Sequence, residues 1–409
     1  MRAALPLSAL LLSCLSAFAA CSSEPTPVGS SGSSGGTSGA PGDAGEGGVP
    51  SDASTPDAVT PSDASGDADA GPVGKLFAFV GSSDGKIRSY GVDAKLGTWT
   101  FVKESAAGTN PSFLAFDPPR RRVVAVDSAG GGLVRSFAFD PATGGVSELG
   151  SKPAGGTGST HLSFDPAGKW VMVANYNGGN MSIFPIDAAG ALGDASDTKA
   201  SGAMSHWAGT NPSGTHVFVP ALGANVVAQY TLSAATGALT DNGTAALPPG
   251  AGPRHLAFHA SEKWAYVINE LAVTVTTFDF DKATGKLTAK QTISALPVGQ
   301  STAGVSGAEI FVHPSGKHVY ASTRGFNSVV QLAIDPTNGT LTRVAHVDTG
   351  GNRPRSFGMD PEGTLLYAGN EAVDQVVGFR IDGTTGTLTP LGKTVDVKGP
   401  TFVGLARIP

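Results

Sequence analysis

The chain has 409 residues, among them 57 glycines, 28 prolines and only two cysteines, and 15% of its residues are charged. This composition argues against a coiled coil, a helical bundle and a disulfide-rich scaffold, and it favours a turn-rich all-β protein. The formal net charge of -6 hides a division, because residues 22–74 carry eight acidic residues and no Lys or Arg. Without those eight acids and Arg2, residues 75–409 keep 26 basic and 25 acidic residues, so we expect no nucleic-acid partner.

The N-terminus has the layout of a secretory signal. Arg2 precedes an apolar run, Ala3 to Ala20, that ends in small residues and is too short to form a stable membrane-spanning helix. We therefore predict a signal peptide over residues 1–20. The segment Phe18-Ala19-Ala20-Cys21 resembles a bacterial lipobox with Phe where Leu is commoner, which makes Cys21 the predicted lipidation site. Two alternatives stay open: lipidation of Cys14, and a plain signal peptide followed by a bystander cysteine.

Residues 21–74 are predicted to be a lipidated, disordered linker. Ser, Gly, Ala, Pro, Asp and Thr dominate this stretch, so it cannot bury enough apolar surface to offset the entropy of ordering. Its acidic side chains repel one another and extend it. We expect the protein in the cell envelope, at the outer membrane or the periplasmic face, or secreted, with the lipid as its only membrane contact.

One pattern recurs from residue 75 to the C-terminus. A strand that ends in a tight turn is followed by a β-branched strand such as Val171 to Asn175, and then by a hairpin such as Asp281-Lys282-Ala283-Thr284-Gly285. The turns recur every 46 to 54 residues, at Pro118, Pro166, Pro212, Ala260, Pro314 and Pro361. Such a period is typical of four-stranded propeller blades.

The chain ends supply the last blade. Leu76 to Val80 has the pattern of a second strand without a first, and Pro400 to Leu405 that of a first strand followed by nothing. Together they complete one blade, which makes seven, and the 335 residues from Lys75 to Pro409 give about 48 per blade. The predicted fold class is therefore all-β, a seven-bladed β-propeller closed by both chain ends. Two stacked β-sandwiches would not explain a single period.

Charged residues that interrupt an otherwise neutral repeat position mark candidate functional sites. The position at the start of each first strand is occupied by Ser112, Thr160, His206, Arg254, Ala308, Arg355 and Thr401, and the next position adds His161, His255 and Glu309. The position that ends each second strand is occupied by Ser82, Ser128, Tyr176, Leu222, Glu270, Arg324 and Glu371. Because the two strands are antiparallel, both positions should surround the same mouth of a central channel.

We therefore predict that His206, Arg254, Glu270, Arg324 and Arg355 converge. Three arginines against one glutamate leave surplus positive charge at a narrow mouth, which a carboxylate or phosphate ligand would neutralise. The alternative is that these residues form ion pairs that only hold the blades together. Four other histidines, His216, His259, His313 and His318, are expected in turns or at the surface. The sequence has no zinc motif, nucleophile elbow or phosphate loop, which predicts acid–base chemistry without a metal or cofactor.

Five segments in matching order resemble the lactonase family of seven-bladed propellers, which contains propeller-type 6-phosphogluconolactonases and carboxy-muconate lactonising enzymes. They are Gly252 to His259, Tyr266 to Leu271, Glu309 to Pro314, Ser322 to Gly325 and Arg353 to Phe357. The resemblance implies His206, Arg254, Glu270 and Arg324 as the catalytic set. It also implies departures beside that set, where Met204 replaces a second histidine and Ala221 and Asn225 replace acids.

The resulting hypothesis is hydrolysis of a small anionic or sugar lactone by a monomeric enzyme. Arg254 or Arg324 would stabilise the oxyanion. Glu270 or His206 would take the proton from water and the other would return one to the leaving hydroxyl, in an order that the sequence does not assign. The predicted substrate-binding residues are His255, Arg355, Tyr176, His161 and Glu371. Two alternatives stay open: a cyclase that closes a muconate-type dicarboxylate to a lactone, and a non-catalytic surface propeller used for binding.

Overall fold

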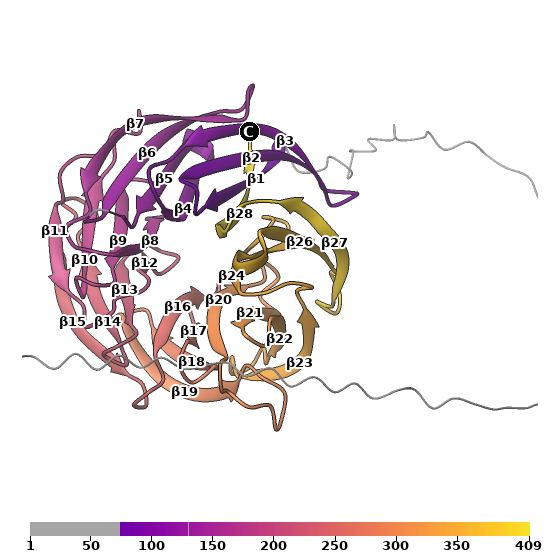
Figure 1. Cartoon of the computed structure of the whole chain (residues 1–409). Coiled ribbons are helices and arrows are strands. Elements are labelled where there is room, and N and C mark those ends of the chain that lie inside the picture. The colour runs from indigo at the N-terminus through magenta and orange to yellow at the C-terminus, as the bar shows by residue number, and fades with distance from the viewer. Residues whose placement is uncertain (1–73, 130) are drawn as a thin grey trace, which may run out of the picture. The chain divides into compact units, whose positions relative to one another are not determined.

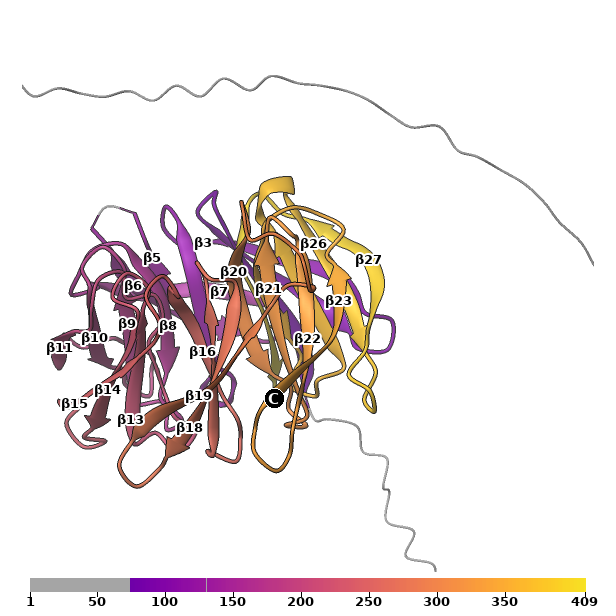
Figure 2. The same ribbon diagram turned by 90° about the horizontal axis from the view of Figure 1, so that it is seen from below.

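The computed structural model describes residues 74–129 and 131–409 (Figure 1). Within these residues the chain forms seven four-stranded antiparallel sheets, which stand as blades around one axis. Seen from the side, the connecting loops gather at the two ends of the strands (Figure 2). The predicted signal peptide, Cys21 and the linker as far as residue 73 lie outside the described residues. No helix in the described part of the chain has the length and apolar character needed to cross a bilayer.

Each blade is given from its inner to its outer strand. Blade one contains β28 (Pro400–Ile408), β1 (Lys75–Ser82), β2 (Lys86–Asp93) and β3 (Thr98–Ala106). Blade two contains β4 (Pro111–Asp117), β5 (Arg122–Asp127), β6 (Leu133–Asp140) and β7 (Gly145–Pro153), and blade three contains β8 (Ser159–Phe164), β9 (Trp170–Asn175), β10 (Asn180–Pro185) and β11 (Asp197–Ala200). Blade four contains β12 (Gly209–Thr210), β13 (His216–Ala221), β14 (Val226–Leu232) and β15 (Leu239–Ala246), and blade five contains β16 (Pro253–Phe258), β17 (Trp264–Asn269), β18 (Thr274–Asp281) and β19 (Lys286–Ser294). Blade six contains β20 (Ser306–Val312), β21 (His318–Arg324), β22 (Ser328–Ile334) and β23 (Leu341–Asp348), and blade seven contains β24 (Pro354–Met359), β25 (Leu365–Asn370), β26 (Gln375–Ile381) and β27 (Leu388–Asp396). Two short 3-10 turns, η1 (Pro118–Arg120) and η2 (Glu371–Val373), complete the described elements.

The hydrophobic core lies between neighbouring blades. The second strands, such as β9 and β17, are buried at every residue because another blade covers each of their faces. The outer strands, such as β3 and β19, are mostly exposed, which explains their higher content of Lys, Glu and Thr. At the predicted outer hairpins Gly144 and Gly285 have φ values of +65° and +70°, the positive φ that this turn requires. The predicted repeat of seven four-stranded blades is therefore confirmed.

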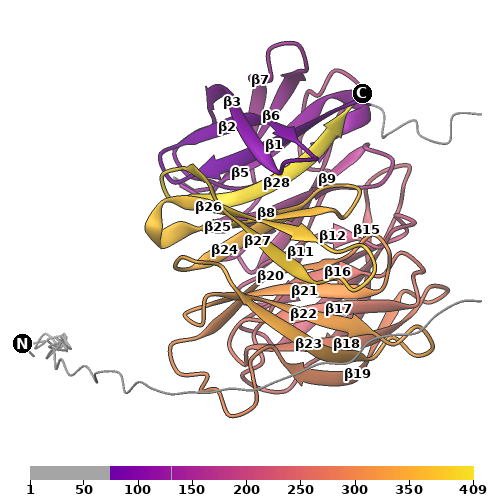
Figure 3. The same ribbon diagram turned by 90° about the vertical axis from the view of Figure 1, so that its right-hand side faces the viewer.

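The ring is closed by pairing of the two ends of the described chain, as predicted. β1 and β28 are antiparallel neighbours, with register partners from Lys75 and Ile408 to Ser82 and Pro400 (Figure 3). An ion pair ties this blade to blade seven: Arg407 donates from Nε to Oε1 of Glu362 at 2.7 Å and from Nη2 to Oε2 at 2.8 Å. β28 also contacts β24 of blade seven and β4 of blade two, so the closing strand packs against both neighbouring blades.

The closing strand predicts a large stability cost for Phe402→Ala. The Phe402 ring is buried between blades one and two, with its centroid 4.7 Å from that of Phe113 and 6.0 Å from that of Phe116. Removing a buried phenyl ring costs about 3–5 kcal/mol of unfolding free energy, measurable by urea denaturation. Val298→Ala is the control, because Val298 is 92% exposed and its loss should change stability by less than about 0.5 kcal/mol. Equal losses in the two variants would contradict the packing described for β28.

Candidate active site

The inner strands carry a β-bulge close to the positions that the sequence singled out. The register shifts between Pro253 and His255 on β16, between Gly307 and Ile310 on β20, and between Pro354 and Ser356 on β24. A bulge leaves a residue out of the ladder and breaks the strict alternation of side chains. Consecutive residues therefore reach the same inner cavity, as the lining by both Arg254 and His255 shows.

Blade four differs from the predicted pattern. His206 was expected at the start of the inner strand, but that strand is only the two residues of β12 and begins at Gly209. Before it the chain is held to β13 and the turn after it by a bridge between Ser205 and Ala221, and by bonds from the His206 N–H to the Pro220 carbonyl and from the Leu222 N–H to the Met204 carbonyl, both 2.9 Å. The ladder is interrupted between Ser205, which faces Ala221, and Gly209, which faces Phe218, and the register shifts by one residue over this interval.

Glu270 is the centre of the charged cluster. Its Oε2 lies 3.0 Å from Nε of Arg254, and its Oε1 lies 2.8 Å from Nη2 of Arg324. Arg254 is almost fully buried and also donates from Nη1 to the Ala308 carbonyl at 2.5 Å, across to blade six. Arg324 donates from Nη2 to the Gly307 carbonyl at 3.1 Å. One carboxylate thus holds two guanidinium groups from neighbouring blades, while Glu270 itself stays partly exposed at the mouth.

Three histidines lie together beside these charges. The His255 ring centroid is 5.1 Å from that of His206 and 5.3 Å from that of His161. Tyr176 packs edge-on against His206 with a centroid distance of 5.6 Å. His255 Nδ1 lies 2.7 Å from Oε1 of Glu309, which is also buried. The structure therefore brings the predicted His206, His255, His161 and Tyr176 into one cluster.

Burial controls the ionisation of this cluster. It holds the pKa of His161, His206 and His255 well below the usual value, and the positive charge of Arg254 lowers all three further. Burial and the neighbouring Arg324 lower the pKa of Arg254 to about 9. Burial also raises the pKa of Glu309 to about 7. At neutral pH the three imidazoles are therefore uncharged and able to accept protons.

A second charged group lies at the same mouth on blade seven. Arg353 Nε is 3.5 Å and Arg355 Nε is 3.9 Å from the carboxylate of Glu371. Arg355 is largely buried, and burial lowers its pKa, whereas Glu371 opposes that shift. Sequence reasoning identified Arg355 and Glu371 but missed Arg353. Arg353 could have been found from its place in the segment Arg353-Pro354-Arg355, two residues before a predicted site residue.

The mouth contains a polar cleft of about 430 Å³ over blades five to seven. It is lined by Glu270, Gly304, Ser306, Arg324, Gly325, Asn352 and Arg353. Deeper in the channel a cavity of about 10 Å³, the size of one water molecule, is lined by Arg254, His255, Glu309, Arg355 and neighbouring side chains. His161, His206 and His255 are buried and do not line the cleft, although the sequence suggested His161 and His255 as substrate-binding residues and His206 as a catalytic one.

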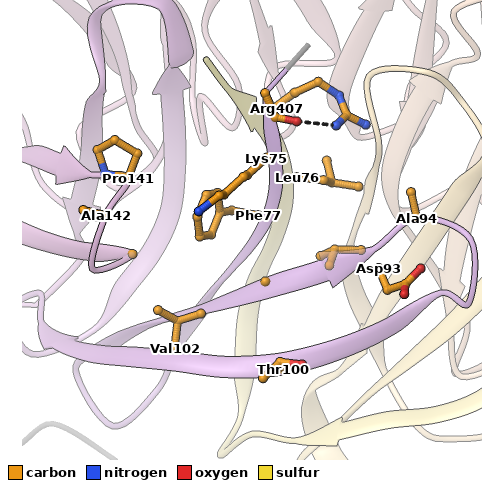
Figure 4. A pocket seen from close by; sticks show the side chains of 14 residues that line it. Lys75, Leu76, Phe77, Asp93, Ala94, Thr100, Val102, Pro141, Ala142 and Arg407 are labelled. Atoms are coloured by element: carbon orange, nitrogen blue, oxygen red, sulfur yellow. Dashed lines mark hydrogen bonds between the residues drawn. The ribbon is translucent and has the colours of Figure 1, made fainter. Parts of the chain in front are cut away.

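A larger hollow of about 590 Å³ lies at the opposite ends of the strands, between blades one and two (Figure 4). Leu76, Phe77 and Val102 form its apolar part, and Arg407 donates to the Gly74 carbonyl at its edge. Of its charged side chains, Asp93 is occupied by accepting bonds from the Lys95 and Leu96 N–H groups. It offers no group of titratable side chains comparable with the mouth, so volume alone does not identify the site.

The remaining histidines lie away from the mouth. His259 and His313 occupy turns, as expected, and each contacts a glycine carbonyl of the next blade. His216 was expected at the surface or in a turn, but it is buried at the start of β13, under the Gly285 hairpin of blade five. Within residues 74–129 and 131–409, no group of three or more His, Cys, Asp or Glu side chains is placed to hold a metal ion.

Comparison with known proteins agrees with this geometry. A family model described as "Lactonase, 7-bladed beta-propeller" matches residues 77–405. The chain belongs to this lactonase family. It is similar to the 6-phosphogluconolactonase of Bacillus subtilis, with 32% identity over 291 residues that cover 68% of this chain and 82% of the relative. It is also 28% identical over 306 residues to a 6-phosphogluconolactonase of Formosa agariphila, covering 69% of this chain and 86% of that one.

A solved structure of the periplasmic gluconolactonase of Pseudomonas aeruginosa is also similar to this lactonase-family chain. It superimposes with a TM-score of 0.75 and 27% identity, covering 82% of this chain and 100% of that one. The resemblance predicted from five short segments is therefore confirmed over the whole propeller. The roles of individual residues remain predictions.

The three buried histidines predict that this lactonase-family propeller loses stability as the pH falls below about 6.5. The unfolded state takes up protons there that the folded state does not, so each histidine costs about 1.4 kcal/mol of unfolding free energy per pH unit. Glu309 acts in the opposite sense between pH 4.5 and about 7, because its folded-state pKa is raised.

His161→Gln should lower the proton uptake on unfolding by about one, measured by urea unfolding at about pH 7.5 and about pH 5.5. Lys290→Gln, on outer strand β19, is the control. A pH dependence unchanged by His161→Gln would contradict the burial of an uncharged imidazole.

Proposed function

We propose that this protein is an exported lactone hydrolase of the 6-phosphogluconolactonase type that opens a sugar lactone by acid–base chemistry without a metal. The observation that carries the proposal is the Glu270 carboxylate held between Arg254 and Arg324 at a mouth that also receives His206 and Tyr176. The similarity to a 6-phosphogluconolactonase and to a periplasmic gluconolactonase supports the reaction class. The predicted signal peptide supports export.

The reaction adds one water across the lactone ester bond. Water attacks the carbonyl carbon, its proton passes to a base, and the carbonyl oxygen becomes negatively charged. Collapse of this intermediate breaks the bond to the ring oxygen, which takes the proton back and leaves as a hydroxyl. The products are the hydroxy acid and no other species, so no co-reactant is needed.

His206 is the better placed base. Burial and Arg254 hold the pKa of His206 well below the usual value, so its imidazole is uncharged and one ring nitrogen keeps a lone pair for the proton of water, although the same shift makes it a weaker base. Both oxygens of Glu270 are instead engaged by guanidinium groups, Oε2 by Arg254 and Oε1 by Arg324. We therefore assign proton transfer to His206 and the holding of both arginines to Glu270.

Arg324 is the better placed electrostatic stabiliser. It lines the 430 Å³ cleft, whereas Arg254 lies below it and is engaged with Glu270 and the Ala308 carbonyl. The guanidinium of Arg324 is fixed before substrate arrives by bonds to Glu270 and to the Gly307 carbonyl. A fixed donor in a poorly hydrated site contributes about 3–4 kcal/mol to stabilising an oxyanion.

The far wall of the cleft selects the charge of the substrate. Arg353, which lines the cleft, and Arg355, which lines the small cavity, share only one carboxylate, that of Glu371, which leaves this group with a net positive charge. A carboxylate or phosphate on the lactone would balance it. Phosphorylated sugar lactones belong to the cytoplasm, so an exported enzyme of this kind would act on a sugar lactone that carries a carboxylate or no charge.

Glu270→Gln should abolish most of the lactonase activity. The amide cannot balance two guanidinium charges, so both arginines shift and kcat/KM for glucono-δ-lactone falls by about 100-fold or more. The measurement is acid release by the purified full-length protein at neutral pH, corrected for spontaneous hydrolysis. Glu104→Gln on outer strand β3 serves as the matched control and should retain wild-type activity.

Three results would contradict this assignment in different ways. Unchanged turnover in Glu270→Gln removes the proposed role of the carboxylate. If the wild-type protein converts a muconate-type dicarboxylate and hydrolyses no lactone, the cyclase alternative is favoured. Binding without turnover of either class would favour a non-catalytic surface propeller.

Arg353→Gln should discriminate between charged and neutral substrates. Loss of this guanidinium should raise KM about 10-fold for an anionic sugar lactone, such as glucaro-1,4-lactone with its free carboxylate or 6-phosphogluconolactone, and less than about 2-fold for glucono-δ-lactone. Lys290→Gln is the control for a general effect of removing positive charge. An equal rise in KM for charged and neutral lactones would show that the blade-seven wall does not read charge.

A further inference from the structure

A buried carboxylate–imidazole pair lies directly beneath the proposed active site. His255 on β16 and Glu309 on β20 meet across blades five and six, with Nδ1 and Oε1 2.7 Å apart, and both side chains are nearly fully buried. The same Oε1 accepts the Ile310 N–H at 3.1 Å, which fixes the carboxyl group in place. The proposed reaction, as described so far, uses neither residue.

The surroundings of the pair determine where its proton lies. Arg254, Arg324 and Arg355 all disfavour positive charge on His255, and the flanking rings of His161 and His206 are uncharged. An uncharged imidazole carries one N–H. With that proton on Nδ1, facing Glu309, the other nitrogen Nε2 has a free lone pair. The carboxyl group of Glu309 exchanges its own proton near neutral pH, since burial raises its pKa to about 7.

Two ring nitrogens in this cluster have no partner. Nε2 of His255 and Nδ1 of His206 are both buried without a hydrogen bond, and the two rings are neighbours, 5.1 Å apart between centroids. Leaving both nitrogens unpaired is costly in a dry environment. A donor on one ring and a lone pair on the other would satisfy both, after a small ring rotation or through one water.

We propose that Glu309 and His255 are positioning residues that hold His206 in its catalytic tautomer. Glu309 accepts the Nδ1–H of His255, Nε2 of His255 accepts the Nδ1–H of His206, and Nε2 of His206 keeps its lone pair for the attacking water. This inference rests on the proposed lactonase function, because it assigns His206 as the base of that reaction.

The hydrogen-bonded series Glu309–His255–His206 also accounts for the path of the proton during turnover. When Nε2 of His206 takes the proton from water, the imidazolium keeps its Nδ1–H directed at His255, and the Glu309 carboxylate lies behind His255 to offset the new positive charge. When the ring oxygen of the lactone leaves, it takes the proton from Nε2 of His206, and the series returns to its starting state. No proton is gained or lost by the pair over one cycle.

The first experiment reads the tautomers directly and needs no substrate. Nitrogen-15 NMR of histidine-labelled full-length protein at about pH 8 should show His255 and His206 uncharged, each with its proton on Nδ1. A His206 resonance with the proton on Nε2 would overturn the proposal. Because this readout is independent of turnover, it decides the tautomer even if the wild-type protein hydrolyses no lactone, a result that would refute the proposed function separately.

The second experiment compares Glu309→Gln with Asp360→Asn. Glu309→Gln should lower kcat at least about 10-fold, leave KM within about 2-fold, and remove the dependence of kcat on pH around neutrality. Asp360 is an equally buried carboxyl group that accepts the Thr364 and Leu365 N–H groups at the far ends of the strands, so its amide variant should keep the wild-type kcat and pH profile. A Glu309→Gln enzyme with wild-type kcat and pH profile would reduce the pair to a contact between blades. Should that variant fail to fold, the NMR result on the wild-type protein still decides.

Discussion

The β-bulge at the start of the inner strands is the constraint on which the candidate site depends. In a regular strand consecutive side chains point to opposite faces, so only one of Arg254 and His255 could face the channel. The bulge removes one residue from the ladder, and both side chains then line the same inner cavity. The same irregularity on β24 brings Arg355 and Ser356 to that cavity. A site built from adjacent residues of several blades follows from this single backbone feature.

Hydrogen bonds that cross from blade to blade hold the inner strands together. The sequence left open whether the charged residues form a functional site or only join the blades, and the structure is compatible with both at once. Thr401 donates to the Pro111 carbonyl, Ser112 to the Ser159 carbonyl and Arg254 to the Ala308 carbonyl. Arg254 thus occupies a position that uncharged hydroxyl residues fill in other blades, where its contact is structural. Its second contact, with Glu270, has no counterpart at Ser112 or Thr401 and serves the site. The ion pairs hold blades together and also fix donors before a substrate arrives, which is what electrostatic stabilisation requires.

The sequence was sufficient to predict the fold because its turn residues recur at intervals of 46 to 54 residues, about the length of one blade. Turn residues such as Pro166 and hairpin glycines such as Gly285 recur once per blade, and a closed ring permits only one pairing of the chain ends. It was also sufficient to bring Glu270 beside Arg254 and Arg324, since antiparallel strands fix which ends meet. The sequence did not reveal how deeply each of these side chains is buried. His255 looked like a substrate ligand because the bulge that buries it beside Glu309 leaves no mark in the residue pattern.

The residues that line the cleft and the residues that depart from the family pattern lie in different blades. The 430 Å³ cleft is of the size that binds small molecules, and it is lined from blades five, six and seven. The positions that depart from the family pattern, Met204, Ala221 and Asn225, belong to the approach to β12 and to blade four, outside that lining. They surround the segment that carries His206 and leave the Glu270, Arg324 and Arg353 wall untouched. In the proposed function, the altered positions therefore bear on how His206 is held, while Arg353, which these departures do not reach, would read the charge of the substrate.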